Sequence, residues 1–239
     1  MHIVQCIFNF IANIYWFVIF NLRILIIILL ILLGIIPCNN RCISRSFIDE
    51  YVKECREKRI SLYDDIFKKE VGKLGWDWKI LASVVWNESR FSVNATSSQG
   101  ARGLMQFMPR TAERFGLVGD DVIDPEKSIK AGVDYLLFLD RRFDDEILDR
   151  EERIKFVLAS YNAGPGHVRD AMALAKKYGD NFCVWNGNVE KWLLALQERK
   201  YYNDEVCKYG FFYGRYTVKY VQNVFDRYYL YSGQVTENI

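Results

Sequence analysis

The sequence WNESRFSVNATSSQGARGLMQFMP occupies residues 86–109 and joins the end of an apolar helical pattern to a polar turn region that contains glycine. Leu81, Val84 and Val85 precede it at the spacing of one buried helix face. Glu88 comes seven residues after Leu81, so its carboxylate continues that apolar face. A carboxylate on a buried face is either paired with a cation or kept there for proton chemistry. Glu88 is therefore the first candidate for a catalytic residue.

The composition excludes several classes of protein. The chain has 239 residues and a net charge of +2, which fits one domain with an appendage and gives no basis for nucleic-acid binding. The two histidines are His2 and His167, which excludes an HExxH zinc enzyme and makes any Ser-His-Asp or Cys-His mechanism depend on His167. Cys183 and Cys207 could form a disulfide in an oxidising compartment, but free thiols fit the sequence equally well.

The N-terminus is typical of membrane targeting. Residues 3–20 carry no charge, and residues 24–36 are wholly apolar apart from one glycine. A helix in the core of a globular domain would have a polar face, so the bilayer or the export machinery is the expected environment. We expect residues 1–38 to form a signal or membrane-anchor segment and residues 39–60 to form a tether. An uncleaved anchor and a lipoprotein modified at Cys38 both remain open, and either leaves the remainder at the periplasmic face.

Helical periodicity continues through the rest of the chain, without strand-like alternation or internal repeats. The clearest helix start is Asp124-Pro125-Glu126, where an N-cap aspartate precedes proline at the first helical position. Gly164-Pro165-Gly166 is expected to break the helical pattern. The expected helices cover residues 61–74, 76–88, 109–115, 125–143, 151–162, 168–178, 188–198 and 216–231. We predict a mostly α fold with one domain at residues 61–233.

Four segments together resemble one family. They are ESRF at 88–91, SQGARGLMQFMPRTA at 98–112, ASYNAGPGHV at 159–168 and YYNDEVCKYGFFYGRYTVKYV at 201–221. The first three resemble the signature blocks of the family 1 lytic transglycosylases, whose SLT catalytic domain has a lysozyme-like fold of the goose type. The last resembles the membrane-bound branch of that family. The resemblance covers residues 60–231 and implies cleavage of the MurNAc-β-1,4-GlcNAc bond of peptidoglycan without water, giving 1,6-anhydroMurNAc ends.

The resemblance implies that a single glutamate, Glu88, acts first as acid and then as base. An apolar setting, which Trp86 and Phe91 could supply, would raise the pKa of its carboxyl and keep the acid form available. The alternative is a structural glutamate paired with Arg90 or Arg102. Residues 91–109 contain no acidic residue, which favours a mechanism with one carboxylate over the two-carboxylate scheme of most glycosidases.

The resemblance also implies a set of substrate-binding residues. Ser97 would contact the substrate's acetamido group or the base, although it could instead satisfy the local backbone. Tyr161 is expected to donate toward Glu88 or the acetamido group. One departure is Tyr216, because the family commonly has glutamate before the following threonine. The full predicted set is Ser97, Gly103, Leu104, Gln106, Met108, Tyr161, Asn162 and Tyr220.

Three functions are compatible with these features of the sequence. The first is a membrane-associated lytic transglycosylase of the cell envelope, acting as a monomer on peptidoglycan glycan strands, with no metal or organic cofactor implied. The second is a hydrolytic goose-type muramidase, which would leave a reducing end. The third is an inactive peptidoglycan-binding protein, which the presence of Glu88 and Gln106 disfavours. Aromatic-rich segments such as residues 211–213 could stack on sugars, but most of these residues are expected to pack in the core or at an interface, and none is assigned to sugar binding.

Overall fold

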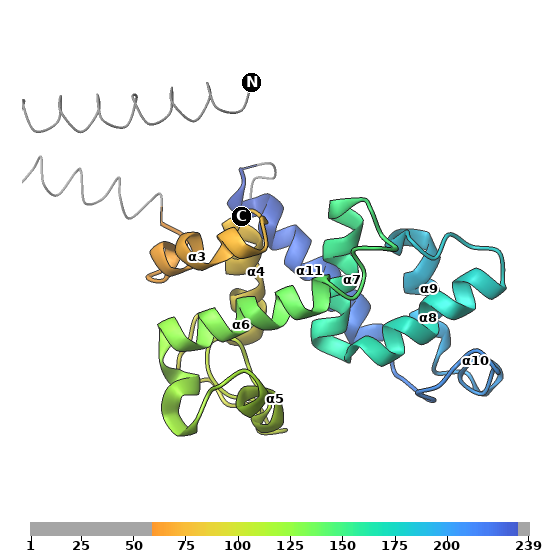
Figure 1. Ribbon diagram of the computed structural model, residues 1–239, viewed down its shortest axis with the longest axis horizontal. Coiled ribbons are helices and arrows are strands. Elements are labelled where there is room, and N and C mark those ends of the chain that lie inside the picture. Colours follow the sequence, from red (N-terminus) through yellow and green to blue (C-terminus); the bar gives the residue numbers. More distant parts are fainter. Residues whose placement is uncertain (1–58, 234–239) are drawn as a thin grey trace, which may run out of the picture. The chain divides into compact units, whose positions relative to one another are not determined.

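The computed structural model describes residues 59–233, which lie in one compact unit (Figure 1). The predicted anchor at 1–38 lies outside the described residues, as does the predicted tether at 39–60 except for its last two positions. Between residues 59 and 233, no helix combines the length and apolar character needed to cross a membrane.

The described part is built from helices, which confirms the predicted mostly α class. Its β-structure is limited, among these residues, to isolated bridges that join Arg102 to Thr96 and to Phe107. The α-helices are α3 (Asp64–Glu70), α4 (Trp78–Ser89), α5 (Pro109–Arg114), α6 (Pro125–Asp140), α7 (Arg150–Ala163), α8 (Pro165–Lys177), α9 (Glu190–Ala195), α10 (Arg199–Tyr202) and α11 (Arg215–Tyr231). Short helical turns of other types are η1 (Val71–Lys73), η2 (Gly119–Ile123) and η3 (Trp185–Val189).

Aspartate side chains fix the starts of the main helices. The carboxylate of Asp77 accepts a hydrogen bond from the Lys79 amide at 2.9 Å at the start of α4. Asp124 accepts from the Lys127 amide at 2.9 Å, with proline at the first position of α6, as the sequence predicts. These bonds satisfy amides that have no partner within the helix, and the negative charge complements the helix dipole.

Two helix starts differ from the prediction. The break after α7 takes only Gly164, which has a φ of 82°, and Pro165 already forms the first turn of α8. Proline suits that position because its missing amide hydrogen would have no partner there. The sequence predicts the first helix from residue 61, whereas α3 begins only at Asp64, and Leu62 is 84% exposed. Asp64 is buried and accepts bonds from the amides of residues 60 and 61, which places Leu62 outside the helix.

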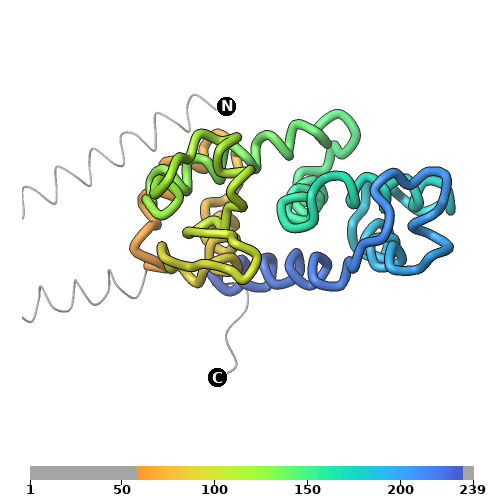
Figure 2. Tube along the Cα trace, turned by 90° about the horizontal axis from the view of Figure 1, so that it is seen from below, coloured from red at the N-terminus to blue at the C-terminus, as the bar shows by residue number. Residues whose placement is uncertain are grey.

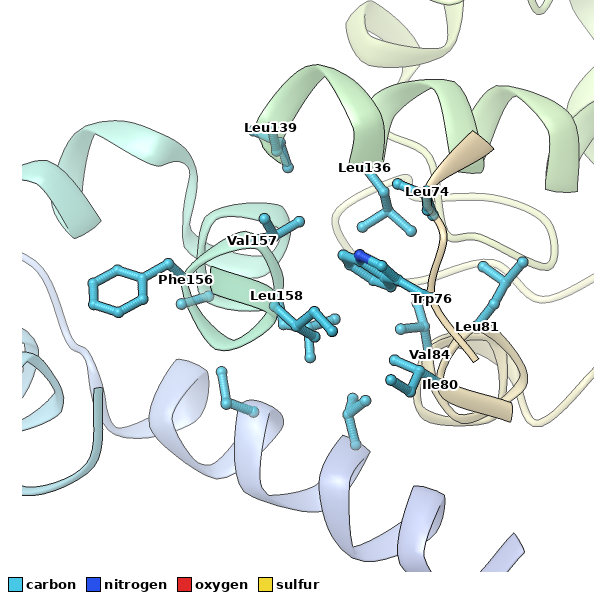
Figure 3. Close-up of a cluster of buried hydrophobic side chains, with 14 of the residues drawn as sticks. Leu74, Trp76, Ile80, Leu81, Val84, Leu136, Leu139, Phe156, Val157 and Leu158 are labelled. Carbon is cyan, nitrogen blue, oxygen red and sulfur yellow. The ribbon is translucent and has the colours of Figure 1, made fainter. Parts of the chain in front are cut away.

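The core forms where α4, α6 and α7 meet (Figure 3). Leu81, Val84 and Val85 are fully buried, which confirms the buried face predicted before Glu88. Figure 3 shows Leu136 of α6 and Leu158 of α7 closing over the same space, and both are fully buried. Burying a leucine-sized side chain contributes roughly 1.5–3 kcal/mol. This packing fixes the position of α4 and of the carboxylate at its end.

Helix α11 connects the two ends of the domain. It packs against α4, α7 and α9. Figure 2 shows it as one long blue helix that runs from the region of α8–α10 to the region of α4. Residues near position 220 therefore come to lie beside residues near position 88, although more than half of the described chain separates them in sequence.

Candidate active site

Glu88 lies in the last turn of α4 and is partly buried. The helix ends immediately after it, because Arg90 and Phe91 both have positive φ values, of 53° and 62°. Two successive non-glycine residues in this region are uncommon and cost free energy, and such strain gathers at functional sites. The chain therefore turns away at this point and leaves the carboxylate at the exposed end of a core helix.

The Glu88 carboxyl keeps its proton up to a much higher pH than an exposed glutamate does. Burial raises its pKa from 4.5 to about 7. Its place at the C-terminal end of α4, where the helix dipole is negative, disfavours the charged form as well. No second carboxylate contributes to the shift, so no neighbouring acid needs to be invoked. This matches the setting that the sequence predicts for a general acid.

The alternative of an ion-paired structural glutamate is wrong for the described residues. The guanidinium of Arg102 pairs with Asp120 at 3.3 Å. The guanidinium of Arg90 lies over the Trp86 ring, 4.7 Å from its centre. Neither cation forms a salt bridge with Glu88, whose carboxyl therefore has no counterion within residues 59–233.

Two tyrosines from distant helices reach the carboxyl. The buried hydroxyl of Tyr220 from α11 lies beside the Glu88 carboxyl and lowers its pKa by stabilising the charged form, and this hydroxyl has no other hydrogen-bond partner among the described residues. Burial and the charge of Glu88 raise the pKa values of Tyr161 and Tyr220 well above that of free tyrosine. Both phenols therefore stay protonated. The structure thus brings Glu88, Tyr161 and Tyr220 together, as predicted from the resemblance.

The predicted hydrogen bond of Tyr161 is wrong. Its hydroxyl donates to the backbone carbonyl of Met105 at 2.6 Å, and a phenol has only one proton to donate. Tyr161 therefore ties α7 to the loop after α4 and does not donate to Glu88. Asn162 is exposed at the end of α7, and its Oδ1 accepts from the Thr217 hydroxyl at 2.7 Å, which ties α7 to α11.

Gln106 holds the loop together. Its Nε2 donates to the carbonyls of Ala95 at 3.1 Å and of Gly103 at 3.0 Å, and its φ is 49°. Both amide hydrogens are thereby used, so Oε1 is the atom left for a ligand. Ser97 plays a similar part, because its Oγ accepts from the Ala101 amide at 3.0 Å. The local-backbone alternative for Ser97 therefore applies, although its own proton remains available for donation.

The other predicted loop residues differ in their exposure. Leu104 is fully buried, so only its backbone could meet a substrate. Gly103 has a φ of 79°, and a Cβ there would lie 2.0 Å from the Val122 carbonyl oxygen, so its role in the structure is close packing. Met108 is 44% exposed at the start of α5 and remains accessible.

One feature of the site carries no local sequence signal. The guanidinium of Arg227 lies over the Trp86 ring, 4.8 Å from its centre, and this contact joins α11 to α4 close to Glu88. Arg90 also lies over that ring. Such contacts stabilise by about 0.5–2 kcal/mol each. The spacing of a single arginine 141 positions after a tryptophan could not have revealed this contact.

Replacing Gln106 by glutamate is expected to destabilise the domain by about 2 kcal/mol, because a carboxylate would face two carbonyl oxygens, each of which would keep only its backbone donor. Urea unfolding of the full chain measures this change. Gln197→Glu is the matched control, because Gln197 is exposed. Equal stabilities of the two variants would contradict the assigned role of Gln106.

Comparison with known proteins adds independent information. The family model described as transglycosylase SLT domain matches residues 65–183. Membrane-bound lytic murein transglycosylase F from Desulfosudis oleivorans is 39% identical over 170 residues, which is 71% of this chain and 36% of that protein. The protein of the same name from Shewanella loihica is 40% identical over 173 residues, or 72% of this chain and 34% of its own length. The chain thus spans about one third of the length of these curated relatives.

A solved structure supports the fold. The X-ray structure of an inactive Glu-to-Gln mutant of lytic transglycosylase Slt from Pseudomonas aeruginosa matches with a TM-score of 0.50 and 24% sequence identity. The match covers 72% of this chain and 24% of that chain. This similarity confirms the predicted lysozyme-like architecture of the SLT type.

Proposed function

The chain belongs to the transglycosylase SLT domain family, and on that premise we propose that it is a lytic transglycosylase that cleaves the MurNAc-β-1,4-GlcNAc bond of peptidoglycan. The observation that carries the proposal is Glu88: a partly buried carboxyl with a pKa of about 7 and no counterion among the described residues. The names of the relatives supply the substrate class, lytic action on murein.

In the first step, the protonated carboxyl of Glu88 donates to the glycosidic oxygen. The bond from that oxygen to C1 of the muramoyl sugar breaks, and GlcNAc leaves with a free hydroxyl. The sugar left behind has an oxocarbenium-like C1, which its own acetamido group stabilises. No second carboxylate is required, in agreement with the absence of an acidic contribution to the pKa of Glu88.

In the second step, the Glu88 carboxylate accepts the proton of the muramoyl 6-hydroxyl, whose oxygen bonds to C1. The product is a 1,6-anhydro ring, Glu88 returns to its acid form and no water is consumed. The Tyr220 hydroxyl is placed to donate to the carboxylate between the two steps, because it is buried beside Glu88 and has no other partner in the described part of the chain.

The remaining predicted residues are proposed to hold the glycan around Glu88. The hydroxyl proton of Ser97, Oε1 of Gln106 and the side-chain Nδ2 of Asn162 take part in no hydrogen bond within residues 59–233. Met108 offers an accessible apolar contact. Gly103 and Leu104 can contribute through their backbone alone, since the side chain of Leu104 is buried.

We also propose that the enzyme works as a monomer at the periplasmic face of the cell envelope, held to the membrane through residues 1–38 by an uncleaved anchor or a lipid on Cys38. The support is the apolar N-terminal sequence and the membrane-bound designation of the relatives.

The activity is tested by incubating the full chain with purified sacculi and following the release of soluble muropeptides. Release at catalytic enzyme concentrations is expected. Sacculi that stay intact while the protein still binds them would contradict the proposed activity.

The pH dependence of the reaction is expected to report the Glu88 carboxyl. Because the free enzyme needs the acid form, kcat/KM should fall as pH rises through about 7. Tyr220→Phe removes the group that lowers the pKa of Glu88, so the midpoint should move to higher pH. Tyr228→Phe, the same change farther along α11, is the control. A midpoint that Tyr220→Phe leaves in place or moves to lower pH would contradict this arrangement.

A further inference from the structure

Tyr216 lies on the face of α11 that meets α4. Along that face, Arg227 covers the Trp86 ring, and Tyr220 lies beside Glu88 about two turns earlier. Tyr216 precedes Tyr220 by four residues, which places it on the same face about 6 Å farther along the helix. Toward the end of α4 at Ser89, the residues of α11 that lie beside α4 come from nearer the N-terminus of α11. Tyr216 is nearer that N-terminus than Tyr220, so it lies beyond the end of α4.

Tyr216 is an aromatic side chain left in water beside the site. Tyr216 is 74% exposed. Its ring centre lies 5.5 Å from that of Tyr213, with an angle of 60° between the ring planes, and Tyr213 is itself 42% exposed. The next residue, Thr217, is buried and bonded to Asn162, so the ring pair stands next to a predicted substrate residue.

The base of this ring pair is firmly held. Gly214, between Tyr213 and Arg215, is pressed against α9, where a Cβ would lie 2.3 Å from the Leu193 carbonyl oxygen. The Thr217 bond to α7 fixes the other side. Two exposed aromatic rings on a fixed backbone form a surface that is organised before any ligand arrives, which lowers the entropy cost of binding.

We propose that Tyr213 and Tyr216 form a stacking platform for a sugar ring of the glycan strand, next to the rings bound at Glu88. This inference rests on the proposed function. The occupant follows from the place of Tyr216 on α11: it comes one helical turn before Tyr220, which lies beside Glu88, and next to Thr217, which is bonded to Asn162. A glycan bound at Glu88 can extend to Tyr216, and aromatic faces pack against the apolar face of a pyranose. Such a platform would favour longer glycan strands.

The experiment measures binding of GlcNAc–MurNAc oligosaccharides of increasing length to the full chain that carries Glu88→Gln, so that no turnover occurs. Adding Tyr216→Ala is expected to weaken binding of the longer oligosaccharides about three- to tenfold, the range for the loss of one aromatic stacking contact. Tyr216→Phe keeps the ring and should keep the affinity. In the parent, affinity should rise with each added disaccharide until the chain reaches Tyr216, and in the Tyr216→Ala variant this rise should stop at a shorter oligosaccharide.

Phe211→Ala is the matched control. Phe211 is 60% exposed in the same loop, but its ring pairs with Tyr202 of α10, 5.8 Å away, and not with the α11 face. It should bind every oligosaccharide as the parent does. A Tyr216→Ala profile identical to that of Phe211→Ala would overturn the platform and leave the proposed activity intact. Both the platform and the proposed activity would be overturned if the Glu88→Gln parent bound none of the oligosaccharides and the wild-type chain released nothing from sacculi.

Discussion

Glu88→Gln is expected to abolish turnover of peptidoglycan, lowering the rate by about 1000-fold or more, because a general acid contributes about 100- to 10,000-fold and this group acts in both steps. Glutamine keeps the size of the side chain and can neither donate a proton at neutral pH nor accept one. The release of soluble muropeptides from sacculi measures the loss. Activity within tenfold of the wild-type rate would remove Glu88 as the acid and base.

The same substitution provides its own test of folding. In the folded state the Glu88 carboxyl holds its proton up to a pH of about 7, whereas in the unfolded chain it releases the proton near 4.5. The folded state therefore loses stability relative to the unfolded state as pH rises from about 4.5 to 7, because it must bury a charge. Glutamine removes that cost, so Glu88→Gln should be more stable than wild type at pH 8, by about 2 kcal/mol once partial exposure is allowed for.

Thermal or urea unfolding at pH 5 and pH 8 tests this expectation. The difference between the variant and wild type should be larger at the higher pH. Glu151→Gln removes an exposed carboxylate from α7 and should change stability little at either pH. A Glu88→Gln variant that is less stable than wild type at pH 8 would show that the carboxyl is ionised without penalty, contrary to the mechanism.

Gly103→Ala is expected to have the largest effect on folding, destabilising the domain by about 3 kcal/mol or more. A Cβ at this position would lie 2.0 Å from the Val122 carbonyl oxygen, which is backbone and has little freedom to move. The φ of 79° adds the cost of a left-handed conformation for alanine, about 1–2 kcal/mol. The loop would have to shift, and with it the carbonyls of Gly103 and Ala95 that Gln106 holds.

Gly100→Ala separates the two causes. Gly100 lies in the same loop with a φ of 86°, but nothing lies within 4 Å of the position of its Cβ. The Gly100→Ala variant should lose only the stability that corresponds to the left-handed backbone conformation, about 1–2 kcal/mol. Urea unfolding of both variants gives the comparison. If Gly103→Ala destabilised the domain no more than Gly100→Ala does, the close contact of Gly103 with η2 would not hold the loop.

The sequence predicts best what depends on neighbours along the chain. The caps at Asp77 and Asp124 are local, and the buried face before Glu88 follows from helical spacing, so both the helices and the setting of the acid could be expected. The sequence predicts the start of α8 three residues too late, because proline can break a helix or occupy its first turn, and Pro165 occupies the first turn.

Contacts between distant residues could not be predicted in the same way. The resemblance placed Tyr161 near Glu88 but could not show that its proton goes to Met105, 56 positions earlier. Gln106 was expected to face the substrate, whereas its amide hydrogens hold the loop. A hydrogen-bond donor serves whichever acceptor the tertiary fold brings closest, and local sequence does not encode that choice.

The central claim is that Glu88 works alone and that the substrate's own hydroxyl, not water, closes the reaction. Digesting sacculi with the full chain in water labelled with oxygen-18, followed by mass spectrometry of the muropeptides, tests it directly. The expected products are lighter by one water than the hydrolytic muropeptides and carry no label at C1. Reducing-end products that carry oxygen-18 would contradict it and would make the enzyme a hydrolytic muramidase.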